Sequence, residues 1–393
     1  MLSVEEAKTA ILAEAQVLAG IEEVPLFECL GRVLAEDIYS LVDVPRADNS
    51  AMDGIVVACS DCKDEENNLP ISQRIAAGQN TKPLKPETAA RIFTGAEIPK
   101  GGNAVIIQED CHFIDDRVYF RGKPKLGANI RKQGQDIQKG ALILAKGTRL
   151  RPQELSLIAS IGLSQISVFK KLKVGVFSTG NELVDPGQKL LKGQIYNSNP
   201  FGLAGLVLES DCEFINLGKV QDSLEQTIDL LKKAAKKVDI IISSGGVSVG
   251  EEDHVKPAIE ACGTLSLWKI AVKPGKPLAL GKVGSTPFFG LPGNPVSSFI
   301  TFLIFVKPFL EKASGATLTP TNWLSVKSSF QRSAPSREEY LRVRVQNGIA
   351  ELYNNQGSGV LSSVSWSTGI IRQKIGVEIH DNSVIEYLPY ELF

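Results

Sequence analysis

The segment from residue 171 to residue 317 alternates apolar runs, glycine-containing turns and amphipathic stretches, and this alternation constrains the fold most strongly. Residues 239–244 (DIIISS) resemble strands that are buried on both faces of a parallel sheet. Residues 222–238 have helical periodicity, with Asp222 expected as the N-cap. The regular succession of strand, turn and helix predicts an open α/β sheet.

The length of 393 residues exceeds that of one hydrophobic core, so several domains are expected. Short apolar runs separated by Gly and Pro suggest a small β-rich module that interrupts a linker domain. The predicted domains are a discontinuous linker domain (residues 1–44 with 136–170), an inserted β-rich domain (45–135), the α/β domain (171–317) and a C-terminal β domain (318–393).

Two local signals support this division of the chain. Ser3 and Glu6 have the spacing of a capping box and predict a helix over residues 3–19. Asn347 and Gly348 stand between two runs of alternating polarity, which predicts a tight hairpin in the C-terminal domain.

The composition excludes several classes of protein. Lys and Arg total 43 and Asp and Glu total 44, so the chain lacks the basic footprint of a nucleic-acid-binding protein. The longest apolar run, residues 296–306, is about half the ~20 residues that span a bilayer, and the first residues lack a signal-peptide pattern. Six cysteines in this length do not suggest a disulfide framework. We therefore expect a cytoplasmic protein without nucleic-acid or membrane partners.

Cys59 and Cys62 form a C-x-x-C pair, and Cys111 with His112 could complete a metal site. The alternative is two unrelated thiols beside an acidic loop. The sequence leaves this choice open.

Ligands of open α/β sheets bind outside the carboxyl ends of the strands. The turns expected at those ends contain glycine, a carboxylate or both, and glycine lets the backbone approach a phosphate closely. These turns are STGNEL (178–183), KVQD (219–222), SSGGVSVGEED (243–253) and LPGNP (291–295).

Glu182, Asp222 and Asp253 are oxygen ligands suited to Mg²⁺, and Lys273 and Lys276 add positive charge nearby. Each piece also has a plain structural explanation, because acids near a helix start complement its dipole and glycines are common in turns. Together the turns predict a site for a phosphorylated ligand with a divalent cation.

A competing interpretation uses the GVSVG pattern at residues 246–250, which would make Ser248 a hydrolase nucleophile. Such an enzyme needs a histidine base, and His112, His254 and His380 are poorly placed for that role. Ser248 also lies several residues beyond the end of the apolar run, whereas a nucleophile elbow is tight.

Six motifs follow in the order typical of one family: NSAMDG, RIFTGAEIP, STGNEL, SSGGVSVGEED, VKPGKP and LPGNPVSS. Over nearly the whole chain the sequence resembles the molybdopterin molybdenumtransferase family, which includes the E domain of gephyrin. The resemblance implies insertion of molybdate into adenylylated molybdopterin, with Mg²⁺ assisting and release of AMP and molybdenum cofactor. It also implies a homodimer whose cleft joins the α/β domain of one chain to the inserted domain of the other.

The resemblance further assigns site residues and partners. The implied partners are molybdopterin adenylyltransferase and molybdoenzyme maturation proteins. A non-catalytic scaffold that only binds molybdopterin remains the alternative. Two positions depart from the family pattern: Asn181, where many members have Asp, and His254, where many have Tyr. The implied catalytic residues are Asp53, Thr94, Asp136, Glu182, Asp222 and Asp253, and the implied substrate-binding residues are Gly245, Gly246, Ser248, Gly250, Lys273, Lys276, Pro292, Gly293, Asn294, Pro295, Arg342 and Ser358.

Overall fold

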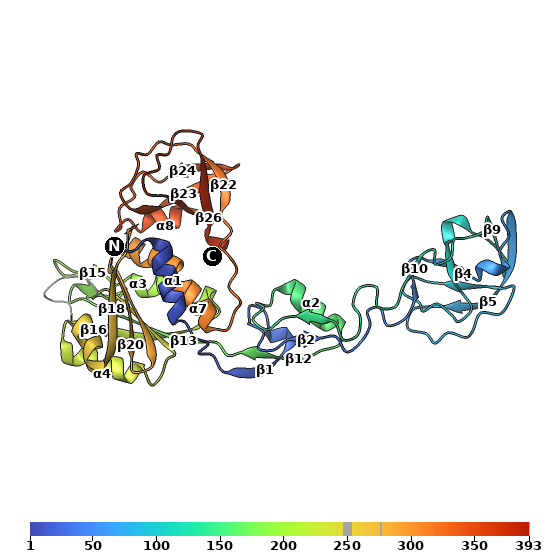
Figure 1. The fold of residues 1–393 in the computed structure, drawn as a ribbon, viewed down its shortest axis with the longest axis horizontal. Helices are drawn as coiled ribbons and strands as arrows, with labels where there is room; N and C mark the ends of the chain where they lie inside the picture. Colours follow the sequence, from blue (N-terminus) through green and yellow to red (C-terminus); the bar gives the residue numbers. More distant parts are fainter. Residues whose placement is uncertain (247–253, 276, 393) are drawn as a thin grey trace.

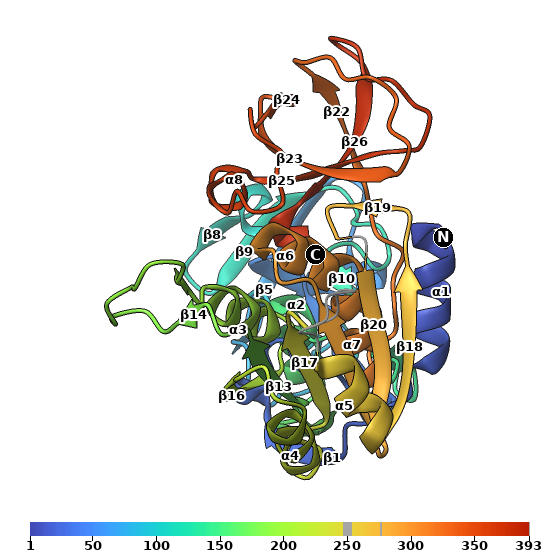
Figure 2. The ribbon, with the colours of Figure 1, turned by 90° about the vertical axis from the view of Figure 1, so that its left-hand side faces the viewer.

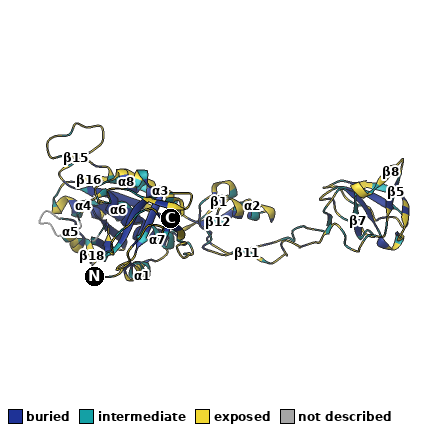
Figure 3. Ribbon diagram, turned by 90° about the horizontal axis from the view of Figure 1, so that it is seen from above, coloured by how far each residue is buried: buried dark blue, intermediate teal, exposed yellow. Residues whose placement is uncertain are grey.

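The computed structural model describes residues 1–246, 254–275 and 277–392 and has an elongated shape (Figure 1). An α/β lobe and a C-terminal β domain lie together at one end, and a β-rich inserted module lies at the other. A small domain that contains helix α2 (Pro152–Ser160) lies between them, followed by two extended segments of the chain, around residues 40–48 and 132–141, that are called the connecting strands. Figure 3 shows buried residues gathered in the α/β lobe and in the strands of the inserted module. Among the helices of the described residues, none has the length and apolar character needed to cross a membrane.

A six-stranded sheet in the order β16-β13-β17-β21-β20-β18 forms the centre of the α/β lobe. The first four strands are parallel, and β20 and β18 extend the sheet in antiparallel fashion. The two antiparallel strands were not predicted from the sequence. The strands are β13 (Lys173–Thr179), β16 (Glu213–Val220), β17 (Ile240–Ser244), β18 (Gly263–Lys269), β20 (Pro277–Val283) and β21 (Thr286–Leu291).

Helices cover both faces of this sheet, each with its own apolar core (Figure 2). One core involves α1, α3 and the continuous helical segment formed by α6, η4 and α7, and the other involves α4 and α5. The bounds are α1 (Val4–Glu14), α3 (Asn199–Glu209), α4 (Leu224–Ala234), α5 (Val255–Cys262), α6 (Pro295–Thr301), the π-helical η4 (Phe302–Val306) and α7 (Lys307–Ala313).

Helix α1 begins with the predicted capping box, since the Ser3 hydroxyl accepts from the Glu6 amide and the Glu6 carboxylate accepts from the Ser3 amide. It ends at Glu14, earlier than expected. Its buried residues pack against α7 and η4 in the α/β lobe. This differs from the predicted grouping of residues 1–44 with the linker, because the apolar face of α1 completes the core over the sheet.

A second expectation, that Asp222 is the N-cap of helix α4, is wrong. The N-cap of this helix is Ser223, whose hydroxyl accepts from the Gln226 amide at 3.5 Å. The Asp222 carboxylate instead accepts hydrogen bonds from the turn after β13, which draws it away from the helix.

The middle of the molecule consists of short strand pairs and one helix. Strand β1 pairs with β12, β2 with β11, and β3 with β10, all antiparallel. The pairs β1–β12 and β2–β11 together with α2 bury a separate small core. Ile130 of β10 packs instead against a core of the inserted module. The elements are β1 (Ile21–Pro25), η1 (Leu26–Glu28), β2 (Ile38–Tyr39), β3 (Asn49–Ser50), β10 (Ile130–Arg131), β11 (Leu142–Leu144), α2 (Pro152–Ser160) and β12 (Gln165–Phe169).

The inserted module contains a six-stranded sheet in the order β7-β4-β6-β5-β9-β8. Cys59 and Cys62 are buried in its core, and burial raises the pKa of the Cys62 thiol to about 11. In the described part of the chain, no three His, Cys, Asp or Glu side chains gather as they would around a metal ion. Its elements are β4 (Gly54–Val57), η2 (Cys59–Asp61), β5 (Glu66–Ile75), β6 (Ala89–Ile92), β7 (Ala104–Ile107), η3 (Gln108–Asp110), β8 (His112–Ile114) and β9 (Arg117–Arg121).

The C-terminal strands close into a barrel, because β25 pairs with both β26 and β23. The predicted hairpin is confirmed, with Asn347 and Gly348 at φ 50° and 75° between β23 and β24. Strand β19 arises in the α/β lobe and pairs with β23, which joins the two domains. The elements are β19 (Val272–Lys273), β22 (Leu324–Ser328), β23 (Glu338–Gln346), β24 (Ile349–Leu352), α8 (Ser362–Trp366), β25 (Gly369–Gln373), β26 (Val384–Pro389) and η5 (Tyr390–Leu392).

Candidate active site

A pocket of about 940 Å³ opens at the carboxyl ends of the parallel strands. Residues of the α/β lobe and the loop 356–359 of the C-terminal domain line it together. The pocket therefore lies where the strand order predicts a ligand site. The predicted residues that line it are Glu182, Gly245, Gly246, Lys273, Pro292, Gly293, Asn294, Pro295 and Ser358.

The two glycines after β17 are required by their backbone conformation. Gly245 and Gly246 have φ values of 93° and 73°, in the left-handed region that disfavours other residues. A Cβ atom on Gly246 would lie 2.2 Å from a methyl group of Val255 and 2.7 Å from the Thr179 methyl group. The chain can therefore pass this closely under the pocket only with glycine at this position.

Glu182 follows strand β13 in the turn that leads to β14 (Leu183–Val184), which pairs with β15 (Ile195–Tyr196). Its backbone carbonyl accepts a hydrogen bond from the Ile195 amide at 2.9 Å. Its side chain folds back over Gly180, where an added Cβ would lie 2.5 Å from the carboxylate. Among the described residues that line the pocket, Glu182 supplies the carboxylate.

Asp222 supports the same turn from the neighbouring strand β16. Its Oδ1 accepts from the Thr179 hydroxyl at 2.8 Å, and its Oδ2 accepts from the Asn181 amide at 3.2 Å. Both carboxylate oxygens thus hold the turn that carries Glu182, and Asp222 is absent from the described pocket lining. A further hydrogen bond joins the same two residues, because Asn181 Oδ1 accepts from the Asp222 amide at 3.4 Å.

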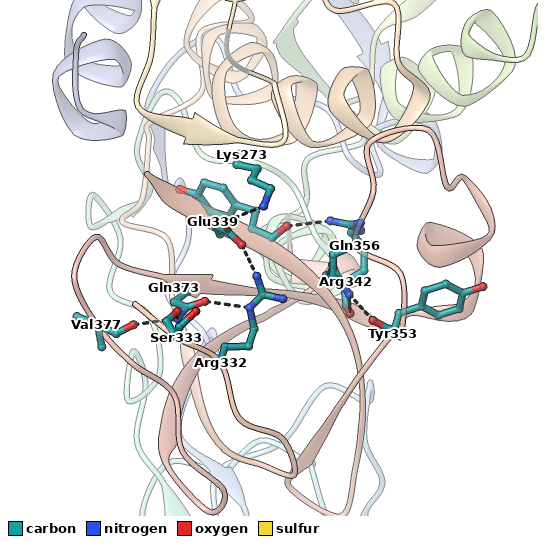
Figure 4. Close-up of polar contacts among 10 residues, drawn as sticks. Lys273, Arg332, Ser333, Glu339, Arg342, Tyr353, Gln356, Gln373 and Val377 are labelled. Carbon is teal, nitrogen blue, oxygen red and sulfur yellow. Dashed lines mark hydrogen bonds and ion pairs between the residues drawn. The ribbon is translucent and has the colours of Figure 1, made fainter. Parts of the chain in front are cut away.

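Lys273 enters the pocket wall from β19. Its ammonium donates to Glu339 Oε1 at 2.9 Å, and Glu339 Oε2 accepts from Arg332 Nη2 at 2.7 Å (Figure 4). A predicted oxyanion-binding lysine is therefore held by a carboxylate of the C-terminal domain.

The loop that contains Ser358 is attached to both domains. The Gln356 side chain accepts from the Arg342 amide at 2.9 Å and donates to the Arg342 carbonyl at 3.0 Å, and Figure 4 shows this group beside β23. The Ser358 carbonyl accepts from the Val296 amide at 3.0 Å, at the start of α6. The loop thereby closes one side of the pocket.

Arg342 lies underneath this loop. It is 1% exposed, and its guanidinium donates to the Ser363 hydroxyl and to the carbonyls of Tyr340 and Gly357. Burial lowers the pKa of Arg342 to about 10. The structure thus places Arg342 behind the pocket wall, where it supports the backbone near Ser358.

Several lining residues were not predicted from the sequence. The Asn199 amide donates to the Ser244 hydroxyl at 2.8 Å and to the Gly293 carbonyl at 2.7 Å, so it ties two of the predicted turns together. Thr179, Arg337 and Gln356 also line the pocket. The position of Asn199 directly before Pro200, at a helix start, is the signal that could have indicated it.

Asp53 directly precedes β4, and Thr94 follows β6, so the two residues lie together in the inserted module. Figure 1 shows this module at the end of the molecule opposite the α/β lobe. The Thr94 amide and hydroxyl both donate to Asp53 Oδ1, at 2.8 and 2.7 Å, and these bonds lower the pKa of the half-buried Asp53 carboxyl. Asp136 is exposed beside the connecting strands, where its amide donates to the Val44 carbonyl at 3.0 Å. Ser248, Gly250, Asp253 and Lys276 lie outside the described residues.

An open α/β sheet with glycine turns at its carboxyl edge, and with Lys273 and Arg337 in the pocket wall, is typical of domains that bind phosphorylated ligands. Family models match the chain in order: the MoeA N-terminal region, domains I and II, over residues 2–162, a probable molybdopterin-binding domain over 175–312, and the MoeA C-terminal region, domain IV, over 329–390.

Individual relatives agree with these matches. The chain is 41% identical over 346 residues to the molybdopterin molybdenumtransferase of Haemophilus influenzae, covering 87% of this chain and 85% of the relative. It is 36% identical over 350 residues to that of a Nostoc species, covering 86% and 80%. The crystal structure of the molybdopterin biosynthesis moeA protein from Pyrococcus horikoshii OT3 matches with a TM-score of 0.88 and 30% identity, covering 99% of this chain and 100% of that chain.

The chain belongs to the molybdopterin molybdenumtransferase family. The resemblance, the fold class and the classification as a transferase of molybdenum cofactor biosynthesis are confirmed. Catalysis is thereby favoured over the alternatives of a binding scaffold and a Ser248 hydrolase.

Proposed function

We propose that this chain inserts molybdate into adenylylated molybdopterin, releases AMP and forms molybdenum cofactor with the assistance of Mg²⁺. The observation that carries the proposal is the pocket at the carboxyl edge of the sheet. Its described lining combines glycine turns, the Glu182 carboxylate and Lys273. Family membership supplies the reaction, and the pocket offers groups that suit its substrates.

The substrates are anions, and the pocket wall offers matching donors. The turns at Gly245, Gly246 and Gly293 can bring backbone amides close to a phosphate. Molybdate is a doubly charged oxyanion, and Lys273 with the Ser358 hydroxyl can donate charge-assisted hydrogen bonds to it. Pro292 and Pro295 restrict the loop between β21 and α6, and Asn294 lies between them. Lys276 and Arg342 stay in the proposal as sources of positive charge at and behind this site.

The donor set fits Mg²⁺, which typically takes one or two carboxylates together with substrate phosphates and water. Glu182 would hold it directly, with Asp253 as a second proposed ligand. Asp222 was placed in the same set, but the hydrogen bonds to both its oxygens favour a role in holding the Glu182 turn. When bound, Mg²⁺ offsets the charge on the phosphates of the adenylylated substrate.

In a homodimer, Asp53 and Thr94 of the inserted module and Asp136 beside the connecting strands come from the second chain and complete the site. The module that carries Asp53 and Thr94 lies at the opposite end of the chain from the α/β lobe that holds the pocket (Figure 1), which is the arrangement that such a shared cleft requires. Asp53 or Glu182 would position water or move protons as oxide ligands leave molybdate. A cytoplasmic location, and molybdopterin adenylyltransferase and molybdoenzyme maturation proteins as partners, belong to the same proposal.

The test offers the purified protein adenylylated molybdopterin, molybdate and Mg²⁺, and measures AMP release together with the activity of a reconstituted molybdoenzyme. We expect both to rise together, and to stop when Mg²⁺ is chelated. Stoichiometric binding of the substrate without AMP release would instead support the scaffold.

A further inference from the structure

Glu339 is a buried carboxylate that contacts two cations from different parts of the chain. Its side chain is 9% exposed, whereas that of Lys273 is 46% exposed and that of Arg332 is 25% exposed. A buried charge is costly unless it is paired, and here each carboxylate oxygen has its own cationic partner. The carboxylate is therefore fixed in place from both sides.

The position of Glu339 is set by the barrel. It lies in β23 directly opposite Lys273 in the register between β19 and β23. Arg332 is itself oriented, because its Nε donates to Gln373 Oε1 at 3.3 Å, and Gln373 donates to the carbonyls of Ser333 and Val377 (Figure 4). The network thus runs from the rigid interior of the C-terminal domain to the ammonium in the pocket wall.

The charges of this network do not cancel. A lysine paired with a carboxylate alone would present no net charge to an incoming anion. The second cation, Arg332, offsets Glu339, so the group of three retains one positive charge. Since Lys273 is the most exposed of the three and lines the pocket, that charge is presented on the pocket side.

We infer that Glu339 is a positioning residue that holds the Lys273 ammonium where it meets the oxyanion substrate. Arg332 offsets the negative charge of Glu339, so that the group of three presents a net positive charge to that substrate. This inference rests on the proposed function, because molybdate is the anion concerned. It makes the C-terminal domain a determinant of molybdate affinity through side chains that do not line the pocket.

The test is a double-mutant cycle on the full chain with molybdate as the varied substrate. We expect Glu339→Gln to raise the KM for molybdate about tenfold, the scale of one charge-assisted hydrogen bond, and to change kcat by less than about threefold. Lys273→Met should raise the same KM. If Glu339 acts through Lys273, the double variant should have the KM of Lys273→Met alone. Multiplied effects in the double variant would overturn the inference.

The role of Arg332 is tested with a separate variant, which can also be used if Glu339→Gln does not fold. Arg332→Gln should raise the KM for molybdate about threefold in the wild-type background and leave it unchanged in the Lys273→Met background. An unaltered KM in the first case would contradict the role given to Arg332.

The matched control is Glu386→Gln. Glu386 also binds an arginine and a lysine in the same domain, Arg372 at 2.7 Å and Lys374 at 2.9 Å, but does not belong to the described pocket lining. The KM of Glu386→Gln for molybdate should equal that of the wild type. A wild-type protein without AMP release would reject the proposed function itself, whereas an active wild type with multiplied effects would reject only the inference about Glu339.

Discussion

The α/β lobe and the inserted module hold their candidate site residues in opposite ways. In the α/β lobe the residues converge on a concave pocket, and the turns that carry them are cross-linked by Asp222, Asn199 and Gln356. In the inserted module Asp53 and Thr94 form a pair on an exposed surface. Under the proposed function, the first region encloses the ligand and the second supplies a carboxylate to the ligand of the partner chain.

The attachment of the inserted module fits this difference. Two aspartates of the connecting strands form hydrogen bonds between these strands. Asp43 accepts from the Lys139 amide and the Gln133 side chain. Asp48 accepts from the Lys132 ammonium and the Gln133 amide. These bonds lower the pKa of both carboxyls. The two connecting strands are thus held together at the base of the module.

The largest expected effect concerns the pocket side. Glu182→Gln keeps the shape of the side chain but removes its charge, and we expect kcat to fall by about 100-fold or more. The dissociation constant for adenylylated molybdopterin should change by less than about threefold, because the turns that hold the phosphates remain. Glu213→Gln, at the opposite end of the sheet, is the control. Turnover near the wild-type value would remove Glu182 from the chemistry.

The next largest effect is expected if the pocket of one chain and the inserted module of the other form one cleft. Glu182→Gln and Asp53→Asn should each inactivate the enzyme, but heterodimers of the two variants contain one cleft in which both acids are intact. Random assortment of a symmetric dimer should therefore restore about a quarter of wild-type activity after subunit exchange. Activity would not recover if each chain used its own module, and this outcome would contradict the shared cleft.

A smaller effect is expected for the support of the Glu182 turn. Asp222→Asn leaves one acceptor oxygen for the two donors, and Thr179→Val removes one of the donors. Each variant therefore loses one hydrogen bond of the Asp222 carboxylate, and each should lower kcat/KM by roughly tenfold. The Mg²⁺ concentration for half-maximal activity should stay the same in both variants if Asp222 positions the turn. A rise in that concentration for Asp222→Asn alone would identify Asp222 as a metal ligand. Glu225→Gln, an exposed acid in the next helix, is the control.

The α/β sheet was predictable because its parallel strands are short runs that end in turns with glycine, a carboxylate or both, and the carboxyl edge then follows from parallel connections. Strands β18 and β20 were missed because their antiparallel pairing places no helix between them, so the repeat stops. The misplaced α1 has a related cause, since its periodicity reveals a buried face but not the surface that covers it.

For the candidate site, residue types and turns could be predicted, but the direction of each side chain could not. Asp222 has the sequence context of an N-cap, yet the Thr179 hydroxyl and the Asn181 amide compete for its oxygens across the sheet. Arg342 stands in a strand of alternating polarity, yet it is buried because the loop 356–359 covers it. Both outcomes depend on contacts between distant segments, which local patterns do not encode.

The smallest predicted effect tests the Asp53–Thr94 pair of the inserted module. The hydrogen bonds from Thr94 lower the pKa of Asp53, so its carboxylate stays ionised to a lower pH than usual. Thr94→Val removes the hydroxyl donor but keeps the amide donor, so the pKa should rise part of the way back. The acid limb of the pH profile of kcat/KM should then move to higher pH, even if the maximal kcat/KM of the variant differs from that of the wild type. Thr88→Val, in the same module, should not move it. An acid limb that stays in place would mean that the ionisation of Asp53 does not control the reaction, and the carboxylate requirement would then rest on the pocket side alone.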